Sequence, residues 1–410
     1  MPSRRILVVA ESINVDDSSG SKANVALIRN LKKVGYELLV LHYTRRDIKL
    51  DGIECLSVPE NRFSLNFFLS RIQRKLQYWF NWNLAKYLEP EFGFSFTFFN
   101  DTKSIKEAIQ KFSPENFDLV LTLSKGASFR PHSALLQTPK FHSKWMAYIH
   151  DPYPFHYYPE PYRWSEPGFK KKIDFFKKVS EKCKWAAYPS LFLAEWMEEH
   201  FQLFEKKRVI IPHQLDQQKP LSNMPKYFKN EFVILHAGTL MKQRSPETLL
   251  LSYLEFLRKN PEAAKKSKLV FIGNYSYHKS TLLKYQSTIP SLDLYPNLPY
   301  IDALGMQNNA SVNVILEFEG NLSPFLPGKF PHCVNAEKPI LHMGPKKSEC
   351  RRILGEDYSF SVEVENVPKI TKTIENLYEK WNLGQNQMTW NNIKFYLSEA
   401  NLKQKIESIF

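Results

Sequence analysis

The stretch that decides the fold, residues 232–257, reads FVILHAGTLMKQRSPETLLLSYLEFL. Residues 232–236 form a short apolar run, which is long enough for a strand buried in a parallel sheet. Gly238 follows, where the backbone must turn tightly or approach a ligand. Residues 245–247 (Ser-Pro-Glu) then predict a helix start, because Ser caps a helix and Pro suits its first position. The apolar residues that follow recur at helical spacing: Leu250, Tyr253, Leu254 and Leu257.

Arg244 lies just before this predicted helix N-terminus. That end of a helix carries about half a positive charge and several unpaired N–H groups. An arginine adds a permanently charged fork that suits phosphate. The turn therefore predicts a phosphate site. The alternative is a solvated arginine on a strand-to-helix turn.

A second stretch, residues 323–341, repeats this logic and reads SPFLPGKFPHCVNAEKPIL. A strand is predicted before it at 312–316, and another at 340–343. Residues 328–331 open a short helix between them, which places Lys329 near a helix start. Two basic turns in one parallel sheet predict a pocket for a nucleotide-diphosphate leaving group, and so a transferase.

These two stretches resemble segments of known enzymes. The run AGTLMKQRSPETLL (237–250) resembles the G-x-L-x-x-x-R/K-x-x-x-x-L segment of GT-B glycosyltransferases, in particular family-4-like (group 1) enzymes of bacterial surface polysaccharide assembly. The run LPGKFPHCVNAEKPIL (326–341) resembles their P-S-K-x-x-E-Y-L-A-x-G-K-P-V segment, and the intervening KLVFIGN (268–274) also fits. The resemblance implies an α/β protein with two Rossmann-like doubly wound domains facing a central cleft, and a C-terminal helix that crosses back to the N-terminal domain.

The resemblance also implies residue roles. Arg244 and Lys329 would hold the donor diphosphate and act in catalysis together with His150, while Gly238 and Thr239 would form the loop under the phosphates. The implied donor-binding residues are Gly20, Gly238, Thr239, Arg244, Asn274, Tyr300, Ile301, Glu319, Ser323, Gly328, Lys329 and His332.

This chain departs from the family pattern at several of these positions. Many relatives carry an arginine where this chain has Thr239. The two glutamates of the family's E-x7-E pair fall near Pro324 and at His332, and Glu319 is the nearest carboxylate upstream. These departures motivate a second hypothesis, a GT-B-shaped binding or scaffold protein whose catalysis has decayed. A sugar-nucleotide epimerase of the same fold is a third.

The segment HDPYP (150–154) carries the other candidate site residues. His150 follows a predicted strand at 145–149, and ligands of open parallel sheets lie at the carboxyl ends of strands. A histidine there could bind a sugar hydroxyl or act as a base, and the segment resembles the family loop whose histidine reaches the donor sugar. Asp151 could orient it, and Tyr153 belongs to a Pro- and aromatic-rich loop that could hold an acceptor. The alternative is a structural histidine in a rigid surface loop.

The rest of the chain gives the domain organisation. A strand at 6–10, a helix at 22–34 and a strand at 36–43 form a βαβ unit, which predicts a parallel sheet. The loop between this first strand and helix contains Gly20 but no G-x-G-x-x-G, so a dinucleotide cofactor is disfavoured. Further strands are predicted at 119–123, 145–149, 185–188 and 209–211. The predicted domains are 1–214 (acceptor), a linker at 215–230, 231–388 (nucleotide sugar) and a C-terminal helix at 389–410 that packs on the first domain.

Composition limits the partners. The chain has 410 residues, enough for two domains, and a net charge of +14 from 56 basic and 42 acidic residues. Such a charge calls for an anionic partner, but no arginine-rich arm or zinc-finger spacing indicates nucleic acid. A nucleotide sugar and a saccharide or lipid-linked acceptor are the expected partners. The aromatic and basic segment 63–99 suits either an anionic membrane surface or a helical cap on the domain.

The remaining expectations concern location and cofactors. The four cysteines form no C-x-x-C pair, which favours a reducing compartment. No apolar run is long enough for a signal peptide or a transmembrane helix, so we expect a cytoplasmic protein, peripheral at the inner membrane face. The chain has no D-x-D motif, and we expect a hexosyltransferase that retains anomeric configuration and needs neither metal nor cofactor.

Overall fold

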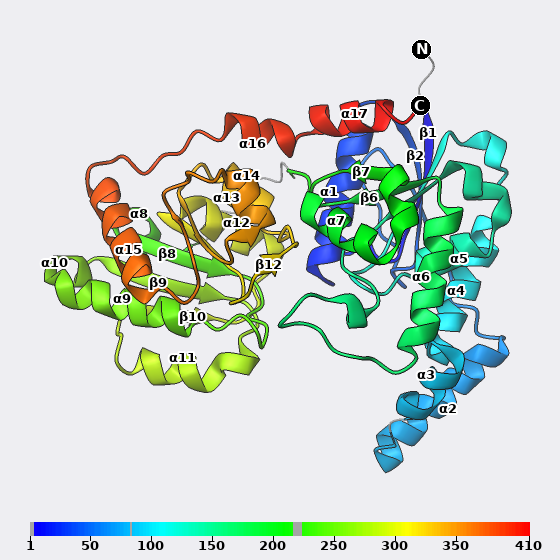
Figure 1. Cartoon of the computed structure of the whole chain (residues 1–410), viewed down its shortest axis with the longest axis horizontal. Coiled ribbons are helices and arrows are strands. Elements are labelled where there is room, and N and C mark those ends of the chain that lie inside the picture. Colours follow the sequence, from blue (N-terminus) through cyan, green and yellow to red (C-terminus); the bar gives the residue numbers. More distant parts are fainter. Residues whose placement is uncertain (1–3, 83, 216–223) are drawn as a thin grey trace. The chain divides into compact units, whose positions relative to one another are not determined.

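Two all-parallel sheets organise the chain, and each belongs to its own compact unit. The computed structural model describes residues 4–82, 84–215 and 224–410 (Figure 1). The first unit comprises 1–158, 162–214 and 399–410, and the second comprises 159–161 and 215–398.

The sheet of the first unit has the strand order β3-β2-β1-β4-β5-β6-β7. Its strands are β1 (Arg5–Ala10), β2 (Glu37–His42), β3 (Glu54–Ser57), β4 (Leu119–Leu123), β5 (Trp145–Tyr148), β6 (Trp185–Tyr188) and β7 (Arg208–Ile210). Its helices are α1 (Ser19–Lys33), α2 (Leu65–Phe80), α3 (Ala85–Phe92), α4 (Phe96–Ile109), α5 (Arg130–Leu136), α6 (Phe169–Lys182), α7 (Leu191–His200) and α17 (Glu399–Glu407).

The sheet of the second unit has the order β10-β9-β8-β11-β13-β15, and a two-stranded ladder pairs β12 with β14. Its strands are β8 (Phe232–Ala237), β9 (Ser267–Ile272), β10 (Leu292–Tyr295), β11 (Val312–Leu316), β12 (Leu322–Ser323), β13 (Ile340–Met343), β14 (Lys347–Ser348) and β15 (Ser361–Val362). Its helices are α8 (Tyr227–Asn230), α9 (Glu247–Lys259), α10 (Pro261–Ala264), α11 (Lys279–Gln286), α12 (Tyr300–Asn309), α13 (Phe330–Asn335), α14 (Glu349–Leu354), α15 (Val367–Asn382) and α16 (Asn391–Tyr396).

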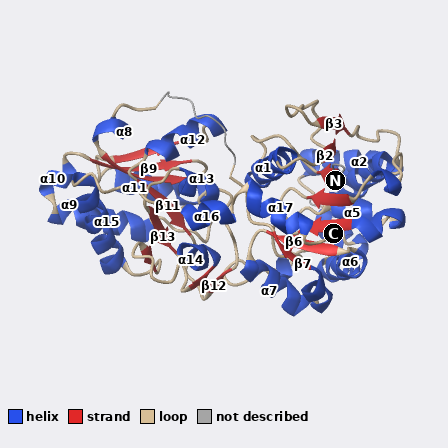
Figure 2. Cartoon of the chain, turned by 90° about the horizontal axis from the view of Figure 1, so that it is seen from above, coloured by secondary structure: helices blue, strands red, loops and turns tan. Residues whose placement is uncertain are grey.

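Alternation along β8 explains why the second sheet is covered on both faces. Phe232 and Ile234 pack into the core beneath α9 and α15. Val233 and Leu235 point to the opposite face and pack with residues of α8 and α12. A parallel strand that is apolar on both faces must be buried between helices, and Figure 2 shows helices on both sides of the strands. These parallel sheets confirm the predicted α/β class.

Two boundaries differ from the sequence prediction. Helix α9 begins at Glu247 with Pro246 as its cap, and the Ser245 hydroxyl accepts a hydrogen bond from the Glu247 N–H at 3.3 Å. The C-terminal tail is divided, since Leu397 packs in the core of the second unit and Leu402 in that of the first. Half of the expected linker at 215–230 lies outside the described residues, and its last part forms α8.

Each sheet has one point where the strand order reverses. In the second unit this point lies between β8 and β11, which neighbour each other in the sheet although the strands β9 and β10 separate them in sequence. Ligands of open α/β sheets bind outside the carboxyl ends of the strands at this point. The residues that follow β8 and β11 are therefore the first place to seek a site.

Candidate functional site

Two glycines shape the backbone at the carboxyl edge of the second sheet. Gly238 follows β8 and Gly273 follows β9, and their φ angles are 132° and 125°, in the region that favours glycine. A Cβ on Gly273 would lie 2.6 Å from the carbonyl oxygen of Gly238, so the two turns approach each other directly. Gly238 and Thr239 are exposed at this edge. The geometry leaves backbone accessible here, as the prediction of a phosphate loop requires.

Lys329 places a buried ammonium group at the same edge. It caps α13, and its Nζ atom is buried without a hydrogen-bond partner among the described residues. Burial lowers the pKa of Lys329 to about 8, and the positive charge of Arg244 adds to the lowering, while Cys333 and Cys350 oppose it. The two predicted cations therefore act on each other electrostatically.

His236 is a third residue whose ionisation these two charges affect. It lies on β8 and is almost fully buried. Burial lowers its pKa far below the usual range, and the charges of Lys329 and Arg244 lower it further. A neutral imidazole thus lies near two cations. An unpaired buried ammonium is costly, and an anion with several acceptor oxygens would satisfy it.

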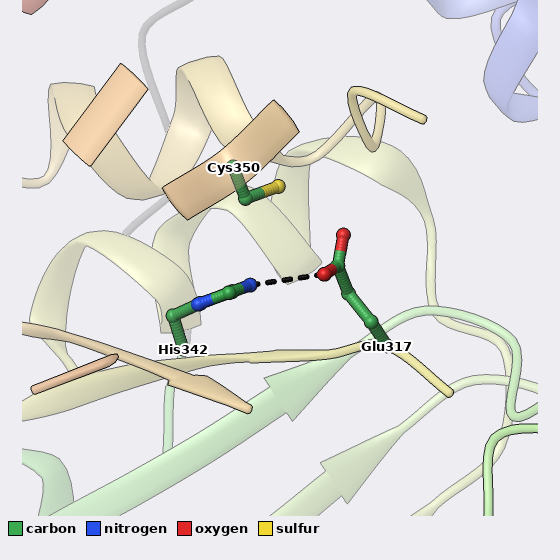
Figure 3. Close-up of side chains that lie close together, drawn as sticks. All are labelled: Glu317, His342 and Cys350. Carbon is green, nitrogen blue, oxygen red and sulfur yellow. Dashed lines mark hydrogen bonds and ion pairs between the residues drawn. The ribbon is translucent and has the colours of Figure 1, made fainter. Parts of the chain in front are cut away.

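The charges of Arg244 and Lys329 also act on Cys350. Cys350 belongs to a buried cluster that the sequence did not reveal, together with Glu317 and His342 (Figure 3). The Nε2 atom of His342 lies 3.0 Å from an Oε atom of Glu317. The other Glu317 oxygen accepts a hydrogen bond from the Ser323 hydroxyl at 2.9 Å. Burial would raise the pKa of Glu317, but hydrogen bonds from His342, Ser348 and Ser323 and the charge of His342 outweigh it and lower the pKa.

This cluster holds the loop after β11 in place. Glu317 extends the pairing of its strand, because its N–H donates to the Met343 carbonyl at 2.8 Å. Ser323 lies in β12, so the Glu317 carboxylate joins that short strand to β13. Glu317, His342 and Cys350 offer ligand atoms within 4.8 Å of one another. Within the described part of the chain, this is the group of His, Cys and carboxylate side chains whose spacing could hold a metal ion. Their existing hydrogen bonds already give them a structural role.

The other predicted donor residues are divided between this edge and the surface. Tyr300 and His332 are buried together, with the Tyr300 hydroxyl 3.4 Å from the His332 Nε2. Asn274 is exposed, and its carbonyl accepts from the Leu240 N–H at 2.9 Å, which ties the β8 and β9 turns together. Ile301 and Gly328 are half-buried.

Contact between Glu319 and the donor stays a prediction. The side chain of Glu319 is exposed, whereas Glu317, two residues earlier, is 2% exposed and hydrogen-bonded within the cluster. The reason is that β11 ends at Leu316, and the next residue still pairs with β13. The buried carboxylate at this edge of the sheet is therefore that of Glu317.

In the first unit, His150 is held in one orientation. Its Nε2 lies 2.9 Å from the Asn24 Oδ1, and the Asn24 amide nitrogen donates to the Ser124 carbonyl at 3.1 Å. Because the Asn24 oxygen can only accept, Nε2 carries the proton and Nδ1 the lone pair. Nδ1 is buried without a hydrogen-bond partner among the described residues. Burial lowers the pKa of His150 far below the usual range, with smaller contributions from His213 and His132, so the ring is neutral at physiological pH.

The other predicted site residues of the first unit are Tyr153, Asp151 and Gly20. Tyr153 is 3% exposed and packs against Phe129 and Phe176 in the core, so the prediction of an acceptor contact through its ring is wrong. Asp151 is half-buried. Gly20 lies in the first turn of α1, and a Cβ there would lie 3.2 Å from the Gly126 backbone nitrogen. This close approach explains the glycine, and contact with the donor stays a prediction.

A charged network at the edge of the first sheet was also missed. Glu11 directly follows β1, and its carboxylate lies 3.0 Å from an Arg130 guanidinium nitrogen. The same guanidinium lies 2.9 Å from Asp101, which also pairs with Arg45 at 2.9 Å. The signal available in the sequence was the position of Glu11 immediately after a buried strand.

Comparisons with solved structures identify the fold. An α,α-trehalose-phosphate synthase (UDP-forming) from Burkholderia xenovorans, in complex with glucose-6-phosphate, matches with a TM-score of 0.63 and 10% identity over 98% of this chain and 100% of its own. WaaG, a glycosyltransferase involved in lipopolysaccharide biosynthesis, matches with a TM-score of 0.58 and 8% identity over 96% and 95%. The chain has the fold of the GT-B glycosyltransferases.

Sequence comparison reaches only part of this GT-B chain. No protein-family model matches it. An uncharacterised glycosyltransferase of Methanocaldococcus jannaschii is 31% identical over 121 residues, which are 28% of this chain and 27% of that relative. The chain thus spans about a quarter of the length of the curated relative that it matches.

The buried carboxylate in the second GT-B unit gives a stability prediction. Replacing His342 with leucine should lower the free energy of unfolding by about 3 kcal/mol, because Glu317 would keep a buried charge without its main partner. Ser361→Ala is the matched control, since it removes only the partner of His342 Nδ1, at 3.1 Å, and should cost about 1 kcal/mol. Urea unfolding followed by circular dichroism measures both.

The pH dependence of the same variants checks the cause. The folded-state pKa of Glu317 is lowered, so its contribution to stability is present above about pH 4.5 and is lost as the pH falls through the folded-state value. The gap between the wild type and His342→Leu should therefore narrow in acid. If His342→Leu were as stable as Ser361→Ala, this account would be contradicted.

Proposed function

We propose that this chain transfers a sugar from a nucleotide-diphosphate sugar to a saccharide or lipid-linked acceptor. The observation that carries the proposal is the buried ammonium of Lys329, at the carboxyl edge of the second sheet. It has no hydrogen-bond partner in the part of the chain that the structure describes, and the charge of Arg244 acts on it. The Lys329 ammonium and the Arg244 guanidinium together suit the two phosphates of a nucleotide diphosphate. The exposed Gly238 and Thr239 would line the same phosphates.

The proposed mechanism is electrostatic. As the sugar leaves, negative charge develops on the oxygen of the outer phosphate, and Arg244 and Lys329 would stabilise it. We propose that these side chains remove the need for a metal, so a chelator should leave the rate unchanged. His150 carries a fixed Nδ1 lone pair that could accept a hydrogen bond from a sugar hydroxyl. Retention of anomeric configuration is what the resemblance to family-4-like enzymes implies.

The ligands of similar structures support this choice of substrates. The Burkholderia xenovorans synthase is described with glucose-6-phosphate, and a trehalose-6-phosphate protein of E. coli, with a TM-score of 0.59 and 11% identity over 98% of both chains, is bound with UDP-2-fluoro glucose. We therefore propose a nucleotide sugar as the donor and a sugar as the acceptor. All four cysteines are free thiols, which supports a reducing compartment such as the cytoplasm.

A donor screen tests the proposal directly. We expect one class of sugar nucleotide to raise the melting temperature, because a ligand at a hundred times its Kd adds about 2.7 kcal/mol of stability. UDP-, GDP-, ADP- and dTDP-sugars form the panel, and a free sugar of the same kind is the control. Absence of any shift across the panel would contradict a nucleotide-sugar site.

A second candidate is a sugar-nucleotide-binding protein without turnover. It is favoured by His332, which stands at the position of a family carboxylate and contacts Tyr300 instead. Calorimetry with the donor found in the screen, followed by an assay for released nucleotide diphosphate with crude acceptor lipid, separates the two. Binding without release would support the second candidate, and acceptor-dependent release would support the transferase.

A further inference from the structure

Helix α2 of the first unit carries its apolar stripe on the side that faces solvent. The exposed fractions are 73% for Leu65, 54% for Phe68, 53% for Ile72 and 64% for Trp79. These positions are spaced by three, four and seven residues, so they share one face of the helix. A surface helix normally turns such a stripe toward the core. Here it is left uncovered by the unit to which it belongs.

Polar contacts attach α2 and α3 to the rest of the unit. The Ser64 hydroxyl, which caps α2, donates to Asn100 of α4. Helix α3 is tied to α6 through the Lys172 ammonium, 3.1 Å from the Glu89 carboxylate. In Figure 1 both helices extend away from the sheet of the first unit. Ser70, which lies across α2 from the stripe, is the buried residue of this helix, so the stripe points outward.

Aromatic side chains continue this surface beyond the stripe. The exposed residues around the two helices include Phe63, Tyr78, Phe80, Trp82 and Tyr87. Isolated exposed apolar side chains are ordinary, but a contiguous group of this kind marks an interaction surface. Tryptophan and tyrosine are the residues that favour the boundary between water and lipid.

The charge of this surface indicates its partner. From 61 to 88 the chain has no acidic residue and five basic ones: Arg62, Arg71, Arg74, Lys75 and Lys86. Lys75 lies beside the stripe, with its ammonium 5.7 Å from the Trp79 ring centre. Long basic side chains next to apolar ones can extend to lipid phosphates while the apolar residues enter the membrane surface.

We propose that α2 and α3 dock on an anionic membrane surface. The stripe of Leu65, Phe68, Ile72 and Trp79 enters the boundary between headgroups and acyl chains, and Arg74 and Lys75 contact headgroup phosphates. A second copy of the chain is disfavoured as the occupant, because it would bring together two copies of α2, a helix with three basic residues and no acidic one. Among the described residues no helix is long and apolar enough to cross a membrane, so the proposal is a surface contact. It does not rest on the transferase activity.

Vesicle flotation with the full chain tests this proposal. We expect binding to vesicles that contain about 30% phosphatidylglycerol but not to pure phosphatidylcholine, and weaker binding at about 0.5 M NaCl. The charge variant Arg74→Glu/Lys75→Glu should reduce binding at least about twentyfold, since each basic residue near the surface contributes about fivefold. The apolar variant Ile72→Ser/Trp79→Ser should also lose binding.

Matched controls separate docking from general effects. Tyr277→Ser/Leu283→Ser removes exposed apolar side chains, 67% and 48% exposed, from the second unit and should leave binding unchanged. Melting temperatures of all variants check folding. Equal binding to neutral vesicles, or unchanged binding by both α2 variants, would overturn the proposal. A wild-type dimer that Ile72→Ser/Trp79→Ser converts to monomer would assign the surface to a second copy instead.

Discussion

Replacing Arg244 with alanine should slow sugar transfer by about a hundredfold to a thousandfold. Arg244 lies between β8 and α9, and its charge acts on both Lys329 and His236. Loss of one donor that stabilises transition-state charge typically costs about 3–4 kcal/mol in kcat. Because the contact strengthens as the diphosphate departs, kcat should fall by more than KM rises.

The control for this variant is Arg258→Ala, which removes an exposed arginine from the last turn of the same helix. That change should leave transfer within about twofold, as expected for a surface substitution. Arg244→Lys should restore only part of the rate, since an ammonium lacks the planar fork. Transfer by Arg244→Ala within about tenfold of the wild type would show that the assigned role is wrong.

Strand-to-helix turns were the most predictable part of this chain, and the reason is local. The strands at 119–123, 312–316 and 340–343 have the predicted limits, because runs of buried apolar residues are bounded by polar or turn residues. The position of Lys329 at a helix start was also predictable, since the glycine before it and the proline two residues after it mark such a start. Such features depend on a few adjacent residues.

The buried cluster was not predictable in the same way. Glu317 and His342 lie 25 positions apart, and they meet only because β11 and β13 are neighbours in register. Sequence spacing gives no sign of that register. The available signal was His342, a histidine inside an otherwise apolar strand. A buried histidine needs a hydrogen-bond partner, so a polar residue on the neighbouring strand was to be expected.

Tyr153 shows the opposite error. A loop rich in proline and aromatic residues suggested an exposed platform, yet its tyrosine packs among Phe129, Phe175 and Phe176. Composition cannot tell which aromatic side chains of such a loop turn inward, because that choice depends on the helices packed beneath it. The aromatic side chains of α2 show the same limit, because composition does not indicate that they are exposed.

Lys329→Met should have opposite effects on stability and on activity. Donor affinity and transfer should each fall by about a hundredfold, because a charge-assisted contact to phosphate is lost. The ligand-free protein, however, should become more stable by about 3 kcal/mol at neutral pH, since the lowered pKa of about 8 shows that the ammonium is held against a desolvation cost. Thermal unfolding and calorimetry measure the two effects.

The pH dependence of stability provides a further test of the Lys329 variant. Between about pH 8 and 10.5 the unfolded chain keeps a proton on Lys329 that the folded chain has lost, so the stability of the ligand-free wild type should rise in this range. Lys329→Met should not show that rise.

The matched control is Lys338→Met, which replaces a half-buried lysine just beyond the other end of α13 and should keep donor binding. A merely structural lysine would lose stability on substitution, so a destabilised Lys329→Met variant with intact donor affinity would exclude the diphosphate site. A gain in stability with a loss of binding is the result expected of a charge that the fold holds ready for an anion.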